Sequence, residues 1–411
     1  MKSAYLWNTA GSMLNAFQSV IFLVILRRVC DLSVAGVFTL AYANANLFLN
    51  MGNYGKRNFQ ASDASRQYSF GAYARSRLIT DLAMLLFSTA YLAYCAVTIG
   101  YPLWKSAAVL LMTLFKLVDS IEDVTDGNYQ QNGRLDLGGR LLTFRLLFTI
   151  CIFAITVILT RDLVVTLLVS TIFTLLFYVA GVHVIKRRYA LPASAGDPPS
   201  VSPWPLLKEC LPLFIAAFLL YYIGNAPKWA IDSVMDDSAQ AIYGFIAMPV
   251  FVVGLLAQFI YMPLVEPLSV RWAEGEVRAF SREFIRQGAF IVGIVAVCDL
   301  LAWLLGVPVL NLLYNTDVSL YLTDLLVLVT GGGFLALAQL FTMGITIIRQ
   351  QHKLTVGYVA VGIISFFASS FSVANWGIAG ASWCYIGCMS VLALWFGVTF
   401  VRCVGRATQG E

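Results

Sequence analysis

Residues Leu163–Ile185, LVVTLLVSTIFTLLFYVAGVHVI, run for 23 positions without a charged side chain and are followed at once by Lys186, Arg187 and Arg188. A helix needs about twenty apolar residues to cross roughly 30 Å of hydrocarbon. A basic cluster at the end of such a span is typical of the cytoplasmic side of a membrane. This stretch therefore predicts a membrane-spanning helix whose carboxyl end faces the cytoplasm.

The apolar character extends over the whole chain. Of its 411 residues, 59% are hydrophobic and only 12% are charged, which leaves too little polar surface for a soluble globular domain. Alternating ten-residue segments of barrel type are absent, so helices must satisfy the backbone in lipid. We predict an all-α polytopic membrane protein with twelve transmembrane helices. The predicted spans are Tyr5–Leu26, Ala35–Asn53, Leu78–Ile99, Trp104–Val124, Leu141–Leu159, Leu163–Ile185, Leu211–Asp232, Ala239–Tyr261, Gln287–Leu305, Leu320–Ile348, Leu354–Ala374 and Ile378–Val401.

Basic residues divide unequally between the two sides of these spans. Placing both termini in the cytoplasm puts twenty of the 27 basic residues on the cytoplasmic side, as the positive-inside rule predicts. The net charge of +5 reflects this topology, and the basic residues are spread over seven cytoplasmic segments, which argues against nucleic-acid binding. The seven remaining basic residues lie outside (Arg27, Arg28, Lys105, Arg161) or within spans and at their ends (Lys116, Arg145, Lys228).

A proline-rich segment divides the spans into two sets of six. Residues 187–207 contain five prolines among alanine, serine and glycine, so a helix cannot persist through them. We predict an N-terminal lobe (1–186), a cytoplasmic linker (187–207) and a C-terminal lobe (208–411). Because six is even, both lobes enter the membrane from the same side, and parallel halves around a central cavity are a transporter architecture.

Two rows of polar residues follow one face of the first and second predicted spans at a spacing of three and four. Amides in hydrocarbon are costly unless they are paired, so these rows should face other helices or a wet cavity. Simple helix–helix adhesion is the plain interpretation, whereas a cavity wall of amides would suit sugar hydroxyls. The rows are Asn8, Ser12 and Asn15, and Asn46, Asn50 and Asn53.

Ionisable residues gather in the predicted N-terminal lobe. Lys116 lies well inside its span with Asp119 one turn away, and Arg145 lies one turn into the next span. If these cations line a cavity, phosphate is a natural ligand for them. Alternatively, Lys116 only pairs with Asp119, and Arg145 reaches the interface along its own side chain. Asp81 is expected to reach the interface in the same way.

The predicted C-terminal lobe carries fewer such groups. Lys228 and Asp232 stand at i, i+4 after Pro227, which allows an ion pair, although snorkelling to the outer surface explains Lys228 equally well. Asp299 lies near the middle of its span without a partner in the same helix, which makes it a candidate for binding a proton or a coupling cation, with Asp232 and Asp119 as further candidates. The run 331–333 of three glycines indicates close packing or a hinge.

Signatures of catalysis and of cofactor binding are missing. Residues 52–56, GNYGK, are too short for a phosphate-binding loop, and no serine or threonine follows the lysine. The eight cysteines make no CxxC motif, so neither a zinc site nor a disulfide framework is indicated. We therefore expect no enzymatic activity, no metal and no cofactor.

Four short segments carry a resemblance to a known family. Through these segments, in their order and at their spans, the chain resembles the polysaccharide-type flippases of the multidrug/oligosaccharidyl-lipid/polysaccharide exporter superfamily. The resemblance covers essentially the whole chain. The segments are Trp7–Ser12 (WNTAGS), Gly52–Asp63 (GNYGKRNFQASD), Gln130–Asp136 (QQNGRLD) and Asn225–Asp232 (NAPKWAID), the last followed by Met248, Pro249 and Val250.

The resemblance implies two pseudo-symmetric six-helix lobes that form a V and open alternately to each side of a bacterial cytoplasmic membrane. The implied cargo is a polyprenyl-pyrophosphate-linked saccharide for O-antigen, capsule or teichoic-type polymers. Candidate partners are membrane lipids and the glycosyltransferases and polymerase of the same pathway, and candidate coupling ions are H⁺ and Na⁺. The implied pyrophosphate-binding cations are Arg57, Lys116, Arg145 and Lys228.

Two other functions compete with this one. A multidrug or organic-cation antiporter of the same superfamily would need an acidic cavity, and Lys116 and Arg145 count against it. A membrane-embedded polysaccharide polymerase or ligase would need a long outer loop with catalytic side chains, and the longest predicted outer loop, 306–319, offers only Asp317.

Overall fold

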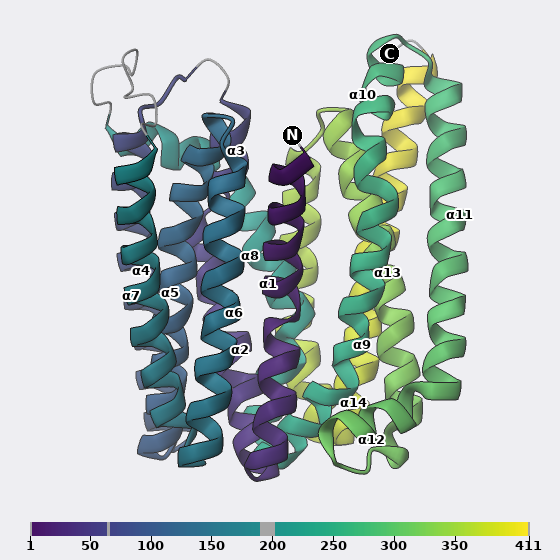
Figure 1. The fold of residues 1–411 in the computed structure, drawn as a ribbon. Helices are drawn as coiled ribbons and strands as arrows, with labels where there is room; N and C mark the ends of the chain where they lie inside the picture. Colours follow the sequence, from purple (N-terminus) through teal and green to yellow (C-terminus); the bar gives the residue numbers. More distant parts are fainter. Residues whose placement is uncertain (1, 64–65, 190–201, 410–411) are drawn as a thin grey trace. The chain divides into compact units, whose positions relative to one another are not determined.

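The computed structural model describes residues 2–63, 66–189 and 202–409, whose regular elements are helices (Figure 1). Ten segments of these residues are long and apolar enough, by length and composition, to cross a membrane. Ten of the twelve predicted spans lie on an α-helix to within one residue, and the other two, Gln287–Leu305 and Leu320–Ile348, extend from an α-helix into a short adjoining helical turn. The count of twelve adds the charged helix Leu103–Gln131 and divides the bent helix His352–Gln409 into two spans. This count, and the side of the membrane on which each loop lies, stay predictions.

The chain divides into two compact units, Met1–Phe218 and Leu219–Glu411. We refer to them as the N-terminal unit and the C-terminal unit. The boundary falls inside a long helix, so the first half of that helix packs with the N-terminal unit. Most of the predicted linker, residues 190–201, lies outside the described residues.

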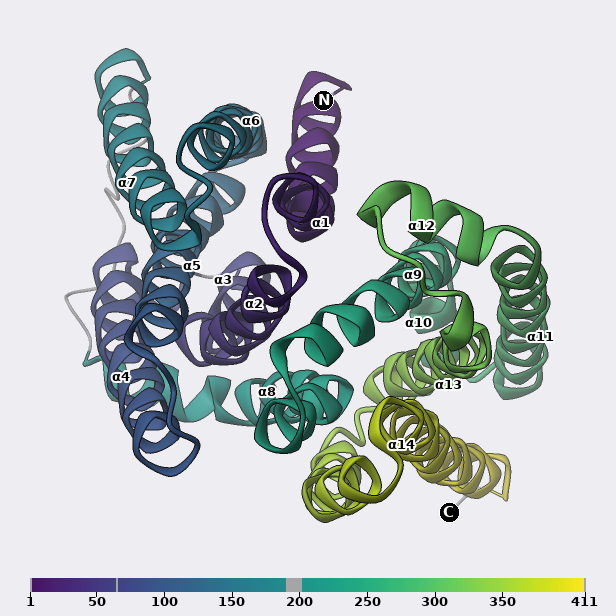
Figure 2. The same ribbon diagram turned by 90° about the horizontal axis from the view of Figure 1, so that it is seen from below.

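The N-terminal unit is built around its fourth long helix. This helix, α5, packs against α2, α3, α4, α6 and α7, and in the end view it lies among them (Figure 2). The turn before α3 uses a left-handed Gly55 (φ 68°), which lets the chain reverse direction after α2. The helices are α1 (Lys2–Val29), α2 (Leu32–Asn53), α3 (Lys56–Ser62), α4 (Phe70–Thr98), α5 (Leu103–Gln131), α6 (Leu135–Thr160) and α7 (Leu163–Arg188).

The C-terminal unit is built around α13, which packs against α9, α11 and α14. The last helix, α14, bends at Gly377 (φ 56°, ψ −132°) into two arms. Its elements are α8 (Pro203–Val234, shared with the N-terminal unit), α9 (Asp237–Tyr261), η1 (Met262–Leu264), α10 (Val265–Ala273), α11 (Val277–Leu301), η2 (Ala302–Gly306), α12 (Val307–Tyr314), η3 (Ser319–Tyr321), α13 (Leu322–Ile347) and α14 (His352–Gln409).

The three consecutive glycines lie on α13 and serve close packing. A Cβ atom on Gly331 would lie 2.7 Å from the ring of Tyr385, and one on Gly333 would lie 2.6 Å from a methyl group of Val295. Neighbouring helices therefore approach the backbone of α13 closely, as small residues allow in membrane helix packing. Of the two interpretations of this glycine run, close packing is the one supported.

Candidate functional site

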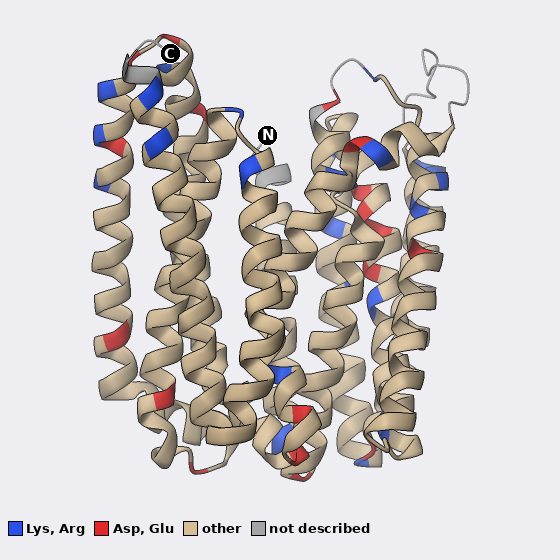
Figure 3. Ribbon diagram, turned by 180° about the vertical axis from the view of Figure 1, so that it is seen from behind, with Lys and Arg blue, Asp and Glu red and all other residues tan. Residues whose placement is uncertain are grey.

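Helix α5 carries a line of charged residues through the N-terminal unit, coloured on the ribbon in Figure 3. Its four carboxylates recur at a spacing of three, one and three residues, which keeps them on neighbouring faces of one helix. Cations from α3, α4 and α6 point at them. We call the whole group the α5 ion network; it comprises the cations Lys56, Arg57, Arg77, Lys116 and Arg145 and the carboxylates Asp81, Asp119, Glu122, Asp123 and Asp126.

The deepest part of the network surrounds Arg145, which is fully buried on α6. Its guanidinium contacts a carboxylate oxygen of Asp119 at 2.7 Å and one of Glu122 at 2.5 Å, and it donates to Thr174 Oγ1 on α7 at 2.8 Å. Lys116 donates from the other side to Asp119 at 2.8 Å. One arginine thus joins α5, α6 and α7.

Lys116 has further partners that fix it in place. Its Nζ donates to Gln18 Oε1 on α1 at 3.0 Å and lies 4.8 Å from the ring centroid of Tyr42 on α2. An amide acceptor, a carboxylate and an aromatic face together compensate a buried ammonium group. The predicted pairing of Lys116 with Asp119 is therefore confirmed, and this pair also ties α5 to α1 and α2.

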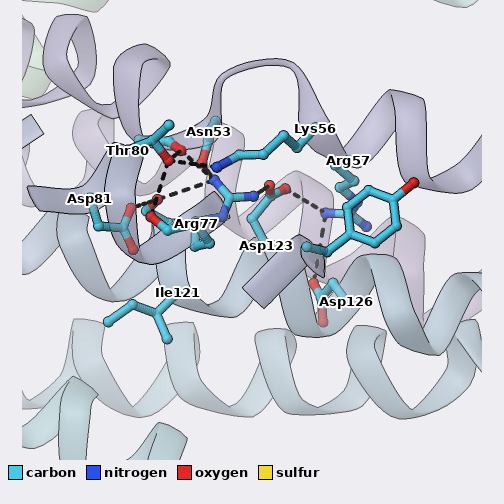
Figure 4. A network of polar contacts seen from close by, with 12 residues as sticks. Asn53, Lys56, Arg57, Arg77, Thr80, Asp81, Ile121, Asp123 and Asp126 are labelled. Atoms are coloured by element: carbon cyan, nitrogen blue, oxygen red, sulfur yellow. Dashed lines mark hydrogen bonds and ion pairs between the residues drawn. The ribbon is translucent and has the colours of Figure 1, made fainter. Parts of the chain in front are cut away.

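The second part of the network surrounds Arg77 on α4 (Figure 4). This side chain is 3% exposed and pairs with Asp123. Its Nη1 donates to the backbone oxygen of Gly52 at 2.7 Å, to Asn53 Oδ1 at 3.0 Å and to Ser120 Oγ at 3.2 Å. Arg77 thereby holds the end of α2 against α5.

Two cations of α3 complete the network. Arg57 lies 3.6 Å from Asp123 and 3.7 Å from Asp126, and its side chain is 33% exposed. Lys56 is buried and donates to Thr80 Oγ1 at 2.5 Å. The left-handed Gly55 turns α3 back over α5 and so places both cations above its carboxylates. Arg57 is the most exposed cation of the network and has the longest contacts.

The α5 ion network contains five cations and five carboxylates, so its formal charge is zero. Burying charges in an apolar interior costs several kcal/mol per ion unless each one has partners. Two oxygens, Glu122 Oε1 and Asp126 Oδ1, are buried without a hydrogen bond among the described residues. The arrangement can hold α3, α4 and α6 against α5, and it offers an anion little uncompensated positive charge except at Arg57.

Three expectations about single side chains are wrong or incomplete. Arg145 does not reach the interface, because it is fully buried between carboxylates. Asp81 is also buried and accepts a hydrogen bond from Ser120 at 2.5 Å. Arg77 is one of the twenty basic residues that the sequence assigns to the cytoplasmic side, and its central place in the network was not predicted.

The polar rows of α1 and α2 differ in what they contact. Asn46 and Asn50 donate to backbone oxygens one turn earlier in their own helix, both at 2.8 Å. Asn53 instead accepts from Arg77. On α1, Ser12 and Asn15 are exposed and Asn8 is half-buried. The row on α1 is therefore the more exposed of the two rows.

In the C-terminal unit, Lys228 is half-buried on α8 and has no hydrogen bond or ion pair among the described residues of that unit. The ion pair with Asp232 that their spacing allows is not formed, although Asp232 itself is buried and has other contacts. Asp299 accepts a hydrogen bond from Thr330 on α13 at 3.0 Å, and its second oxygen is buried without a hydrogen bond.

Sequence reasoning missed Glu122, Asp123 and Asp126 as members of a site. The signal was present, because Asp119, Glu122, Asp123 and Asp126 follow a helical spacing. Asp126 was overlooked because the predicted span ended at Val124, whereas α5 continues to Gln131. Glu122 and Asp123 lie within the predicted span, and they were missed because their cations come from other helices.

Comparisons with known proteins bear on the fold. No family model matches the chain, and no curated protein sequence matches it significantly. Among solved structures, an inward-facing multidrug resistance MATE family transporter of the MOP superfamily superposes with a TM-score of 0.74 at 10% identity, over 96% of this chain and 95% of that chain. The chain has the MATE fold.

Two further structures with the MATE fold agree. An outward-facing multidrug resistance MATE family transporter gives a TM-score of 0.65 at 11% identity, over 100% of this chain and 97% of that chain. A MATE transporter of Vibrio cholerae gives 0.63 at 12% identity with the same coverage. With the long apolar helices, the MATE fold makes this chain a multi-pass membrane protein.

Proposed function

We propose that this chain is a transporter that exports a polyprenyl-pyrophosphate-linked saccharide by alternating access of its two units. The MATE fold supports a transport function, because the structures that share it are described as multidrug resistance transporters in inward- and outward-facing conformations. The four sequence segments that resemble polysaccharide-type flippases support the choice of cargo. The membrane is proposed to be a bacterial cytoplasmic membrane.

Lys228 is the observation that carries the choice of an anionic cargo. It is a half-buried cation in a membrane helix, and none of the described carboxylates of its unit pairs with it. A charge in such a place is expensive and is retained where it contacts a substrate or an ion. An ammonium group binds phosphate as a point charge. We propose that Lys228 contacts the pyrophosphate.

Arg57 is the second proposed pyrophosphate contact. Its distances of 3.6 and 3.7 Å to two carboxylates are longer than hydrogen bonds, and a third of its side chain is exposed. It can therefore exchange a carboxylate for a phosphate oxygen at small cost. Lys116 and Arg145 are proposed to act structurally, because their carboxylate partners lie at hydrogen-bond distance. The exposed row of Ser12 and Asn15 on α1 is proposed to contact the saccharide, together with Asn8.

Such export needs no ATP hydrolysis. Moving two negative charges outward across an inside-negative membrane releases about 4.6 kcal/mol per 100 mV. This free energy would drive the export of a cargo that carries a pyrophosphate.

One observation favours a second candidate function, the exchange of an organic cation for H⁺ or Na⁺. Asp299 is a half-buried carboxylate that accepts from the neutral Thr330, and no cation among the described residues pairs with it. An unpaired carboxylate within a membrane helix is suited to bind a proton or a cation. The same residue would serve as the coupling site of a saccharide exporter, so it does not decide between the two cargoes.

Reconstitution in proteoliposomes tests the proposal. The purified chain should move a fluorescent polyprenyl-pyrophosphoryl saccharide between leaflets, as measured by quenching of the label from outside. Empty liposomes and liposomes with the Lys228→Met variant are the controls, and both should be slower by at least tenfold. Transport of an organic cation without movement of the labelled lipid would contradict the proposal and favour the second candidate.

A further inference from the structure

A crevice of about 400 Å³ opens between α4 and α5 of the N-terminal unit. Leu78 and Leu82 form one wall and Leu117 and Ile121 the other. Cavities of this size take a small ligand or part of a lipid. Neither of the proposed cargo contacts, Lys228 and Arg57, lines this crevice.

The mouth of the crevice is apolar and open to the outside of the helix bundle. Leu78 and Leu82 are 61% and 58% exposed, and they stand at i, i+4 on the outer face of α4. On a membrane-spanning helix such a leucine face meets acyl chains. A lipid chain can therefore enter the crevice sideways from the bilayer.

The floor of the crevice is polar. Arg77 and Asp81 lie there, across from Ile121 (Figure 4). Both amino groups of Arg77 have acceptors, Gly52 O for Nη1 and Asp123 for Nη2, but its Nε–H is buried and has no hydrogen-bond acceptor among the described residues. A buried donor without an acceptor costs about 1–3 kcal/mol, so an oxygen atom of a ligand at this point would be stabilising.

The charge at the floor selects the kind of oxygen. Asp81 lies beside Arg77, and Asp123 already pairs with it, so a phosphate there would meet two carboxylates. A neutral carbonyl oxygen accepts the Nε hydrogen bond without that repulsion. The floor therefore suits an ester or amide carbonyl rather than an ionised group.

Exposed basic residues lie instead near the start of α4 and at the end of α7. Arg75 is exposed and lies one turn before Leu78 on the same face of α4. Lys186, Arg187 and Arg188 are exposed at the end of α7, which packs on α5 and ends on the same side of the N-terminal unit on which α4 begins (Figure 1). Each basic residue near a membrane surface attracts anionic headgroups by about 1 kcal/mol.

We propose that the crevice binds an anionic glycerophospholipid. One acyl chain would lie between Leu78 and Ile121, its ester carbonyl would accept from Arg77 Nε, and its phosphate would lie at Arg75. A polyprenyl phosphate fits less well, because its hydrocarbon chain begins directly at the phosphate and has no carbonyl to reach the floor. The site is independent of the cargo proposed above.

Native mass spectrometry of the delipidated full-length chain tests this site. With phosphatidylglycerol, the wild type should retain one tightly bound lipid, and with phosphatidylcholine it should retain at least fivefold less. Filling the crevice by Ile121→Trp should reduce the bound phosphatidylglycerol at least tenfold. Leu86→Trp is the matched control, because Leu86 is 67% exposed on α4 and does not line the crevice, and it should bind like the wild type.

Two further arms separate the parts of the proposal. A dialkyl ether analogue of phosphatidylglycerol lacks the carbonyl and should bind several-fold more weakly than the ester lipid. Leu117→Trp blocks the crevice one turn away and replaces Ile121→Trp if that variant unfolds. Unchanged lipid retention in the crevice-filling variant, or displacement of phosphatidylglycerol by equimolar polyprenyl phosphate, would overturn the assignment.

Discussion

Helices α5 and α13 are the central helices of their units, and they pack against their neighbours in different ways. α5 contacts its neighbours through buried ion pairs, such as those of Arg145 with Asp119 and Glu122. α13 contacts its neighbours through glycines, which bring the Tyr385 ring and Val295 to its backbone. One helix is fixed by charge compensation and the other by close contact.

The difference shows how much each helix depends on its partners. α13 lies in one of the ten segments that are apolar enough to span a membrane, whereas α5, at 29 residues, does not. Charged residues at the centre of a bilayer are costly until partners neutralise them. α5 is therefore stable in lipid only when α3, α4 and α6 bring their cations to it, while α13 can span the bilayer before it packs.

Removing the central cation should have the largest effect. Arg145→Met leaves Asp119 without one partner and Glu122 without its cation, and breaking a buried pair in this way costs about 3–5 kcal/mol. We expect the free energy of unfolding in mixed detergent micelles to fall by this amount. Arg161→Met, at the exposed end of the same helix, should leave it nearly unchanged.

A second substitution sharpens this result. Adding Glu122→Gln to Arg145→Met removes one uncompensated charge and should recover at least 1 kcal/mol of the lost stability. A double variant that is as unstable as the sum of the single variants would show that Arg145 acts through packing, and α5 and α13 would then not differ in kind.

Overpacking α13 should have the next largest effect. The Cβ of Gly331→Ala would lie 2.7 Å from the buried Tyr385 ring, and forced repacking of this sort costs about 1–3 kcal/mol. Gly293→Ala on α11 has open space around its Cβ and should be neutral or slightly stabilising. The same unfolding measurement compares them. Equal stability of the two variants would contradict the close-packing account of α13.

The sequence predicted contacts within a helix better than contacts between helices. The spans followed from apolar length, and the Lys116–Asp119 pair followed from their spacing of three residues. Arg77 and Asp123 come from different helices, and no local pattern indicates which faces meet. Asn46 and Asn50 could not be assigned either, because an amide that bonds its own backbone and one that lines a cavity look alike in sequence.

A smaller effect is expected at the exposed end of the network. Arg57→Gln removes ion pairs of 3.6 and 3.7 Å from a side chain that is one third exposed, and such pairs contribute about 1 kcal/mol or less. Its melting temperature should fall by a few degrees at most, whereas transport of the labelled lipid should slow several-fold. A stability loss as large as that of Arg145→Met would show that Arg57 belongs to the structural core.

The smallest stability effect, and the most direct test of the account, is expected at Lys228. The account holds that the cations paired with α5 maintain the fold, whereas the unpaired lysine of α8 contacts the cargo. Lys228→Met should therefore keep or slightly raise the melting temperature and slow transport of the polyprenyl-pyrophosphoryl saccharide in proteoliposomes at least tenfold. Transport by Lys228→Met at the wild-type rate, in a fully folded protein, would contradict it.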